Sequence, residues 1–263
     1  MGRLDGKVCI VTGASGGIGA KTAEFYGREG AKVVLAARRE NYLNAVAKKV
    51  RDAGGEALVV VTDIRDKAQA EALVEKTVET FGRLDVLCNV AGYIEAGLRP
   101  VDVFTDEEME TIVDTNLKGT LYVTRAATRV FTRQGVGNVI MVSSVSALTG
   151  NGAGVYTATK GALVALTKHI AMRYANKKPT VRANCVCPGT VWTDMCRREL
   201  AAQEGGQYCP EAQEFNETVG KHGCADVGIS KAVDIANVLV FLASDESACL
   251  NGQVLALDYG CTL

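Results

Sequence analysis

The chain has 263 residues, of which 48% are hydrophobic and 22% are charged, as in a soluble globular protein with a full core. Its 30 acidic and 29 basic residues nearly cancel, which argues against nucleic acid or an anionic membrane as a partner. The sequence has no apolar run near the roughly 20 residues of a membrane helix and no signal-peptide pattern, so we expect a cytoplasmic protein.

The first predicted element is a buried strand at residues 7–12, followed at once by a glycine-rich turn and a helical pattern that ends near Gly30. Glycines let the backbone approach a pyrophosphate, and the start of the helix offers free N–H groups and a positive dipole. We therefore predict a nucleotide-phosphate site in the turn, although its G-x-x-x-G-x-G spacing departs from the general G-x-G-x-x-G fingerprint.

The second predicted strand, residues 32–37, ends in Arg38 and Arg39. The general fingerprint has an acidic residue here that holds the ribose 2′-hydroxyl. A guanidinium instead binds a 2′-phosphate through two hydrogen bonds, so the sequence favours NADP(H) over NAD(H). The alternative is that both arginines only solvate a loop.

Strands and helices then alternate to the end of the chain. Further strands are predicted at residues 57–62, 86–90, 138–143, 180–186 and 253–257, and helices at 41–53, between Asp66 and Gly82, from 106 onwards, after Tyr156 and at 233–243. Asp66 suits a helix N-cap and Gly82 a helix C-terminus. Asn116 and Gly119 are unfavourable inside the helix that begins near residue 106, and this conflict indicates a functional segment.

Tyr156 and Lys160 are four residues apart on a predicted helix, which places both on one face. A phenol beside an ammonium is a plausible acid/base pair, although most such pairs are ordinary surface neighbours. Lowering a tyrosine pKa from about 10 to about 7 requires roughly 4 kcal/mol, which a lysine and the positive ring of an oxidised nicotinamide could supply together.

Residues 194–228 are polar and irregular, and we predict that they form a substrate lid, the alternative being an ordinary surface excursion. The nine cysteines include no CxxC pair and only two histidines accompany them, so we predict reduced, mostly buried thiols and no metal site.

The alternation of strands and helices predicts an α/β fold: a single Rossmann-type, doubly wound parallel sheet of about seven strands with helices on both faces. With no linker or internal repeat, residues 1–263 read as one dinucleotide-binding and catalytic domain. The unusual residues gather at the carboxyl ends of the strands, where such sheets bind ligands.

Several motifs in a fixed order resemble the short-chain dehydrogenase/reductase family over nearly the whole chain. They are Thr12-Gly13-x-x-x-Gly17-Ile18-Gly19, Asp63, Asn89-Val90-Ala91-Gly92, Asn116, Ser144, Tyr156-x-x-x-Lys160, Pro188-Gly189 with Thr193, and Asp258-Tyr259-Gly260. The resemblance implies a catalytic set of Asn116, Ser144, Tyr156 and Lys160. It also implies a cofactor site formed by Gly13, Ser15, Gly17, Ile18, Gly19, Arg38, Arg39, Asp63, Ile64, Asn89, Gly92, Tyr156, Lys160, Pro188, Gly189, Val191 and Thr193.

In the roles that the resemblance implies, Tyr156 exchanges a proton with the substrate oxygen, Ser144 orients that oxygen, and Lys160 binds the ribose and lowers the Tyr156 pKa. Asn116 supports a water in a proton relay. The chain departs from the family at Val90 and Tyr259, and by one residue in the spacing between the serine and the tyrosine. That last departure leaves Ser143 as an alternative to Ser144. Adjacent residues of a strand face opposite ways, so only one of the two serines can point into the site. We choose Ser144 because the loop Gly150-Asn151-Gly152 aligns with the family when the gap is placed after it.

The sequence thus predicts an oxidoreductase that transfers a hydride between NADP(H) and a secondary alcohol or ketone, such as a hydroxysteroid or bile acid. Tyr93, Ile94, Leu148, Val155, Trp192 and Met195 are candidates for an apolar substrate pocket. The alternatives are a 3-oxoacyl-thioester reductase and an NADP-sensing protein without turnover. A homo-oligomer, tetramer or dimer, is expected from the family, with no nucleic-acid or membrane partner.

Overall fold

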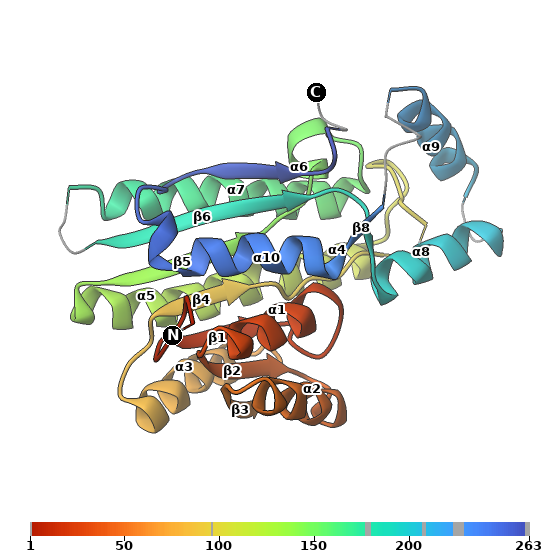
Figure 1. The fold of residues 1–263 in the computed structure, drawn as a ribbon. Coiled ribbons are helices and arrows are strands. Elements are labelled where there is room, and N and C mark those ends of the chain that lie inside the picture. The colour runs from red at the N-terminus through yellow and green to blue at the C-terminus, as the bar shows by residue number, and fades with distance from the viewer. Residues whose placement is uncertain (1, 96, 177–179, 207–208, 223–228, 261–263) are drawn as a thin grey trace.

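A computed structural model describes residues 2–260 apart from 96, 177–179, 207–208 and 223–228. Its centre is a seven-stranded, all-parallel sheet in the order β3-β2-β1-β4-β5-β6-β9 (Figure 1), which confirms the predicted fold class. The strands are β1 (Val8–Thr12), β2 (Lys32–Ala37), β3 (Glu56–Val61), β4 (Val86–Asn89), β5 (Gly137–Val142), β6 (Val181–Pro188) and β9 (Val254–Leu257). Two short strands, β7 (Val191–Trp192) and β8 (Ser230–Lys231), pair separately.

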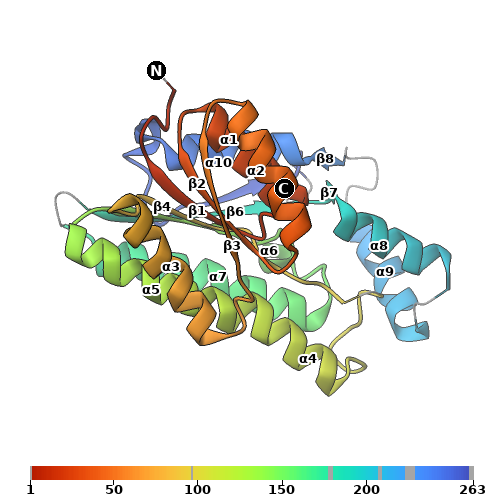
Figure 2. The same cartoon turned by 90° about the horizontal axis from the view of Figure 1, so that it is seen from below.

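Helices cover both faces of the sheet, and Figure 2 shows the two helical layers on opposite sides. One apolar cluster joins the sheet to α1 (Gly17–Arg28), α2 (Glu40–Asp52) and α10 (Ala232–Ala243). The other joins it to α3 (Lys67–Phe81), α5 (Thr120–Gln134) and α7 (Gly154–Arg173). Strands that are buried on both faces consist of continuous apolar residues. Such short apolar runs are what located these strands in the sequence.

The caps of α3 follow the prediction. The Asp66 carboxylate accepts hydrogen bonds from the amides of Ala68 (2.8 Å) and Gln69 (3.2 Å). Gly82 ends the helix in the left-handed region with φ of +76°, where a side chain would be strained.

The strand register aligns the carboxyl ends of the central strands on one side of the sheet. Thr12 of β1 pairs with Ala36 of β2, and Val11 pairs with Cys88 of β4. The turns that follow these three strands therefore meet in space, although the sequence separates them widely.

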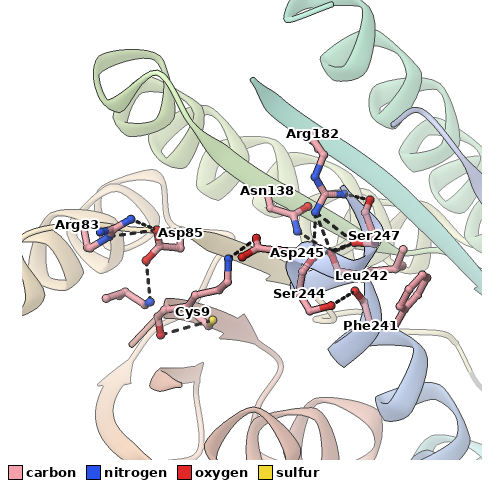
Figure 3. Close-up of polar contacts among 12 residues, drawn as sticks. Cys9, Arg83, Asp85, Asn138, Arg182, Phe241, Leu242, Ser244, Asp245 and Ser247 are labelled. Atoms are coloured by element: carbon pink, nitrogen blue, oxygen red, sulfur yellow. Dashed lines mark hydrogen bonds and ion pairs between the residues drawn. The ribbon is translucent and has the colours of Figure 1, made fainter. Parts of the chain in front are cut away.

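At the opposite, amino-terminal ends of the strands, polar side chains bind the end of α10 and the turn after it. Figure 3 shows Arg182 of β6 and Asn138 of β5 pointing towards carbonyl oxygens there. Arg182 donates to the carbonyls of Ser247 (2.9 Å) and Leu250 (3.0 Å), and Asn138 donates to Leu242 (2.7 Å). The bond to Leu242 satisfies one of the carbonyls that the end of α10 leaves without a helical partner, and the bonds to Ser247 and Leu250 hold the turn that follows.

The structure differs from the sequence prediction in two segments. The helix from residue 106 is not uniform: α4 (Asp106–Ile112) continues as a π-helix, η1 (Val113–Gly119), before α5 begins. The segment predicted as irregular, 194–228, contains two helices, α8 (Asp194–Glu204) and α9 (Pro210–His222), while 207–208 and 223–228 lie outside the described residues. A short helix, α6 (Ser146–Thr149), precedes α7.

Candidate active site

The glycine turn between β1 and α1 is packed too closely for side chains. Gly13 has φ of +68°, and a Cβ on it would lie 2.8 Å from the Ala91 Cα after β4. A Cβ on Gly19 would lie 2.4 Å from the Gly13 carbonyl oxygen. The Thr12 hydroxyl accepts from the amides of Val90 (3.1 Å) and Ala91 (3.2 Å), which ties the turn to the end of β4. Only glycine fits this conformation and this approach.

A cavity of about 590 Å³ lies over these strand ends. Most residues assigned to the cofactor from the sequence line it: Gly13, Ser15, Gly17, Ile18, Gly19, Arg38, Arg39, Asp63, Ile64, Gly92 and Thr193. The start of α1 opens into it, and the α1 N-cap, Gly16, provides no side-chain acceptor for the first amides of the helix. Such an edge can bind an anionic, elongated ligand.

The remaining cofactor-site residues are not among those lining the cavity. Asn89 is buried, and its side chain donates to the Thr124 hydroxyl at 3.0 Å. Pro188, Gly189 and Val191 form the backbone beneath the site: the Gly189 amide, for example, donates to Leu257 O at 3.0 Å. Their expected contact with a cofactor stays a prediction.

Arginines surround the end of the cavity beside β2 and β3. Arg39 donates to the Ser15 hydroxyl at 3.2 Å. Arg65 is bound to Asp63 at 2.6 Å, and this pairing lowers the pKa of the Asp63 carboxyl. Arg38 makes no hydrogen bond or ion pair to the described residues, so its guanidinium can receive a ligand. The sequence analysis did not identify Arg65 as a site residue, because it belongs to no motif. The only signal that could have indicated it is its position two residues after Asp63.

Ser144, Tyr156 and Lys160 meet at the carboxyl end of β5. Ser144 hydrogen-bonds the Tyr156 hydroxyl. Lys160 is 4% exposed, and its Nζ lies 5.6 Å from the Tyr156 ring centre and donates to Val142 O at 2.9 Å. A Cβ on Gly92, which lines the cavity, would lie 3.2 Å from that Nζ. The three side chains therefore lie beside the cavity.

The neighbouring serines face opposite ways. The Ser143 hydroxyl donates to Lys160 O at 2.7 Å and so binds the backbone of α7. The Ser144 oxygen accepts from the Ser146 amide at 3.2 Å and reaches Tyr156. Ser144 is thus the serine beside the tyrosine.

Burial has the largest effect on the pKa values of this group, and the expected lowering of the Tyr156 pKa by Lys160 stays a prediction. Burial raises the pKa of Tyr156 to about 12, and the hydrogen bond from Ser144 offsets this only in part. Burial also lowers the pKa of Lys160 to about 8. The physical reason is desolvation, which disfavours the charged form of each group. The protein alone therefore keeps the phenol protonated at neutral pH.

Asn116 is fully buried in the π-helical turn of η1 and joins two parts of the site. Its side chain binds the main chain of Tyr93, and its Nδ2 also donates to the Thr159 hydroxyl of α7 at 3.2 Å. π-Helical turns inside helices are frequent at functional sites. Asn116 and Gly119, which are unfavourable in a regular helix, therefore lie in the segment where the helix is π-helical.

The segment predicted as a lid borders the cavity. Its α8 contributes Asp194, Met195 and Arg198 to the lining. Glu199 of α8 accepts from the Gly97 amide at 2.9 Å, so the helix is attached to the segment between β4 and α4. The two run side by side in Figures 1 and 2. Arg198, like Arg65, is a charged residue of the cavity lining that belongs to no sequence motif.

The predicted apolar pocket is realised only in part. Tyr93 and Met195 line the cavity, whereas Leu148 and Trp192 are 45% and 48% exposed. Val155 is buried in the protein.

Most of the buried thiols lie in the strands of the central sheet. Cys9, Cys88, Cys185 and Cys187 are free and buried, as predicted, and Cys224 and Cys261 lie outside the described residues. The described part of the chain holds no group of three or more His, Cys, Asp or Glu side chains that could bind a metal ion. None of its helices has both the length and the apolar character of a membrane span.

Comparison with known proteins supplies independent findings. The sequence profile described as short chain dehydrogenase matches residues 7–204. A 3-oxoacyl-[acyl-carrier-protein] reductase, FabG, of Thermotoga maritima is 33% identical over 98% of both chains. The 3beta-hydroxysteroid dehydrogenase 2 of Eggerthella lenta is 32% identical over 98% of this chain and 95% of its own length. The crystal structure of levodione reductase superposes with a TM-score of 0.85 at 32% identity, covering 98% of each chain.

Proposed function

The chain belongs to the short-chain dehydrogenase/reductase family, whose members are oxidoreductases using nicotinamide cofactors, and from this premise we propose that it transfers a hydride between NADP(H) and a secondary alcohol or ketone. The observation that carries the proposal is the hydrogen-bonded pair of Ser144 and Tyr156 with Lys160 beside it, next to a cavity with a glycine-lined floor.

The residues present fit a dinucleotide. Gly13, Gly19 and Gly92 line the cavity without side chains, so a ligand can approach the main chain there, and the N-terminus of α1 faces the same cavity. Gly13, Ser15, Gly17, Ile18 and Gly19 would hold the pyrophosphate. A bound nicotinamide supplies or accepts the hydride, and the protein supplies position and electrostatics.

In the proposed mechanism Tyr156 exchanges the proton at the substrate oxygen, and the Ser144 hydroxyl orients that oxygen. Protonated Tyr156 is the form that reduction needs, since the carbonyl oxygen must receive a proton. In the direction of alcohol oxidation the phenol must first lose its proton. A positive charge on Lys160 favours that step, as does the positive charge of an oxidised nicotinamide ring.

The preference for NADP(H) is supported by the basic end of the cavity. Arg38 and Arg39 follow β2, and Asp63 is already neutralised by Arg65. A 2′-phosphate would therefore meet guanidinium groups and no free carboxylate from these four residues.

Two relatives suggest the substrate. A hydroxysteroid is supported by the Eggerthella lenta relative and by the apolar side chains of Tyr93 and Met195 in the cavity. A 3-oxoacyl thioester is supported by the Thermotoga maritima relative, and it needs the same proton and hydride chemistry. An NADP sensor without turnover is the remaining alternative, and the presence of Ser144, Tyr156 and Lys160 together speaks against it.

The test is oxidation of NADPH, and in parallel of NADH, against hydroxysteroid and bile-acid ketones, 3-oxoacyl thioesters, sugars and small diketones. Tyr156→Phe should bind the cofactor but lose turnover by at least about a hundredfold, while Tyr174→Phe, far from the cavity, should remain active. Tight NADPH binding with no turnover on any ketone would favour the sensor.

We also propose a homotetramer or dimer formed through the helices that carry Asn116 and Tyr156. Leu121 on α5 and Met172 on α7 support this, since they are 39% and 77% exposed. Light scattering of Leu121→Glu/Met172→Glu beside the wild-type protein tests it. The cytoplasmic location stays a prediction.

A further inference from the structure

Arg198 of α8 is a cation in the wall of the cavity that the proposed mechanism does not use. It lines the cavity together with Asp194 and Met195 of the same helix, and it is exposed, so a ligand can reach it. Within the described ranges of the chain its guanidinium makes no hydrogen bond and no ion pair. The N–H donors of this side chain are therefore available to a ligand in the cavity.

The neighbouring Arg197 has a different environment. It forms an ion pair with Asp194, and its guanidinium lies 6.0 Å from the centre of the Trp192 ring. Successive residues of a helix point about 100° apart, so the two arginines leave α8 in different directions. Arg197 therefore compensates the carboxylate that α8 brings to the cavity, and the positive charge of Arg198 is left for another partner.

The first turn of α8 lies against the glycine turn that precedes α1. A Cβ on Gly17 would lie 3.2 Å from Thr193 Cγ2. One on Gly16 would lie 3.9 Å from Asp194 Oδ2. Arg198 follows Asp194 by four residues, so it lies on the same face of α8, one helical turn further on. Because helical side chains lean towards the N-terminus of their helix, we expect Arg198 to lean towards Asp194 and the glycine turn.

The glycine turn offers a phosphate group one set of donors. The N-terminus of α1 opens into the cavity, and its N-cap, Gly16, has no side-chain acceptor for the first amides of the helix. These amides can bind one phosphate group. A pyrophosphate brings a second phosphate group with its own negative charge, and a guanidinium is a favourable partner for that charge.

We propose that Arg198 is a cofactor-binding residue whose guanidinium binds the pyrophosphate of the dinucleotide, so that the bound cofactor joins α8 to the glycine turn. This inference rests on the proposed function, because it requires a dinucleotide in the cavity. The contact forms only with the ligand present, so α8 should be held more firmly once the nucleotide is bound. An anionic group of the substrate is the other ligand that this cation could bind, and the experiment separates the two.

The experiment measures the Kd of nucleotides with and without a second phosphate by isothermal titration calorimetry. Adenosine 2′,5′-bisphosphate has a single phosphate at the 5′ position, whereas 2′-phospho-ADP-ribose has a pyrophosphate there. The pair of 5′-AMP and ADP-ribose lacks the 2′-phosphate, so the test does not depend on the choice between NADP(H) and NAD(H). The proteins are wild type, Arg198→Gln, Arg198→Lys and a control, Arg133→Gln, which removes an exposed guanidinium from α5.

Arg198→Gln should raise the Kd of the pyrophosphate-bearing nucleotide by about tenfold and that of its partner without the second phosphate by less than about twofold. Arg198→Lys keeps the positive charge and should recover part of the loss. Arg133→Gln should bind all the nucleotides as the wild-type protein does. Equal effects of Arg198→Gln on both members of a pair, or no effect on either, would overturn the inference.

Limited proteolysis gives a second readout that needs no turnover. A saturating concentration of 2′-phospho-ADP-ribose should slow cleavage near α8 in the wild-type protein and in Arg133→Gln, but not in Arg198→Gln. Equal protection of all three proteins would contradict a contact between Arg198 and the ligand.

The outcomes also separate this inference from the proposed function. A lower kcat/KM of Arg198→Gln for a 3-oxoacyl thioester, with unchanged Kd for every nucleotide, would assign Arg198 to the substrate and overturn the inference alone. Nucleotide binding that depends on Arg198, without turnover of any ketone, would support the inference and contradict the proposed hydride transfer. A wild-type protein that binds none of the four nucleotides would overturn both.

Discussion

Asn116 and Tyr93 hold one another through two hydrogen bonds. The Tyr93 amide donates to Asn116 Oδ1 at 2.7 Å, and Asn116 Nδ2 donates to Tyr93 O at 2.8 Å. The pair fixes the segment after β4 to the π-helical turn, and the third bond of Asn116, to Thr159, adds the helix that carries Tyr156. One amide side chain therefore sets the distance between a wall of the cavity and the proposed catalytic tyrosine.

Asn116→Ala should lower the free energy of unfolding by about 2–4 kcal/mol, because it leaves buried main-chain groups without partners. It should also lower kcat/KM per mole of folded enzyme. Urea unfolding and steady-state kinetics measure the two effects. Asn184→Ala is the matched control, since this fully buried amide likewise binds Leu250 O (2.9 Å) and the Gln253 amide (3.1 Å), away from the site. Equal kcat/KM in both variants would contradict a positioning role for Asn116.

Arg38→Asp should raise the KM for NADPH by about tenfold or more and change that for NADH much less, because a carboxylate repels a 2′-phosphate. Cofactor titration by fluorescence and kinetics with both cofactors measure the change. Lys49→Asp, an equal charge reversal on the exposed face of α2, should leave the preference unaltered. Unchanged NADPH affinity in Arg38→Asp would refute the 2′-phosphate assignment.

Lys160 should make stability depend on pH. Its pKa is about 8 in the folded protein against 10.5 as the ordinary value, so the unfolded chain binds its proton more tightly. This costs the folded state up to about 3 kcal/mol below pH 8, and the cost disappears as pH rises towards 10.5. Tyr156 acts in the opposite direction above pH 10, because its folded pKa is raised to about 12.

Lys160→Met should therefore be inactive, yet more stable than wild type at pH 7, and the advantage should shrink between pH 8 and 10. Urea unfolding at several pH values measures it. Lys168→Met removes an exposed lysine from the same helix and should show no such dependence. A wild-type stability that stays flat from pH 7 to 9.5 would contradict a lowered pKa of Lys160 in the folded protein.

Glu199→Ala should loosen α8 from the segment between β4 and α4, because it removes the acceptor for the Gly97 amide. We expect the KM for the ketone to rise about three- to tenfold, with kcat changed less, and limited proteolysis to cleave near α8 faster. Glu204→Ala, at an exposed position of the same helix, is the control. A variant with wild-type KM and proteolysis would show that this bond does not hold a lid.

Residues 194–228 show where local sequence patterns fail to predict secondary structure. Polar residues and glycines suggested an irregular segment, yet α8 and α9 form there and bury Ala202 and Ala212. They pack against Leu98 and Cys209, and Leu98 is about a hundred residues away in sequence from α8. The apolar stripe of each helix is too small to identify it without that partner.

The sequence by itself determined the parallel sheet, the seven strands that form it and the positions of the strand ends. Buried strands and capped helices have local signatures, and Gly13, Asp66 and Gly82 carry them in their own neighbourhoods. The same local patterns located the pair of Tyr156 and Lys160 on one helix, and Arg38 at the end of β2.

Only the tertiary structure decided which side chains meet. It placed Ser144 rather than Ser143 beside Tyr156, bound Arg65 to Asp63, and buried the Glu95 carboxyl with no side-chain partner in the described part of the chain. Burial also raised the pKa of Tyr156 to about 12. Desolvation and pairing depend on residues far apart in the chain that packing brings together, and periodicity and propensity carry no record of those contacts.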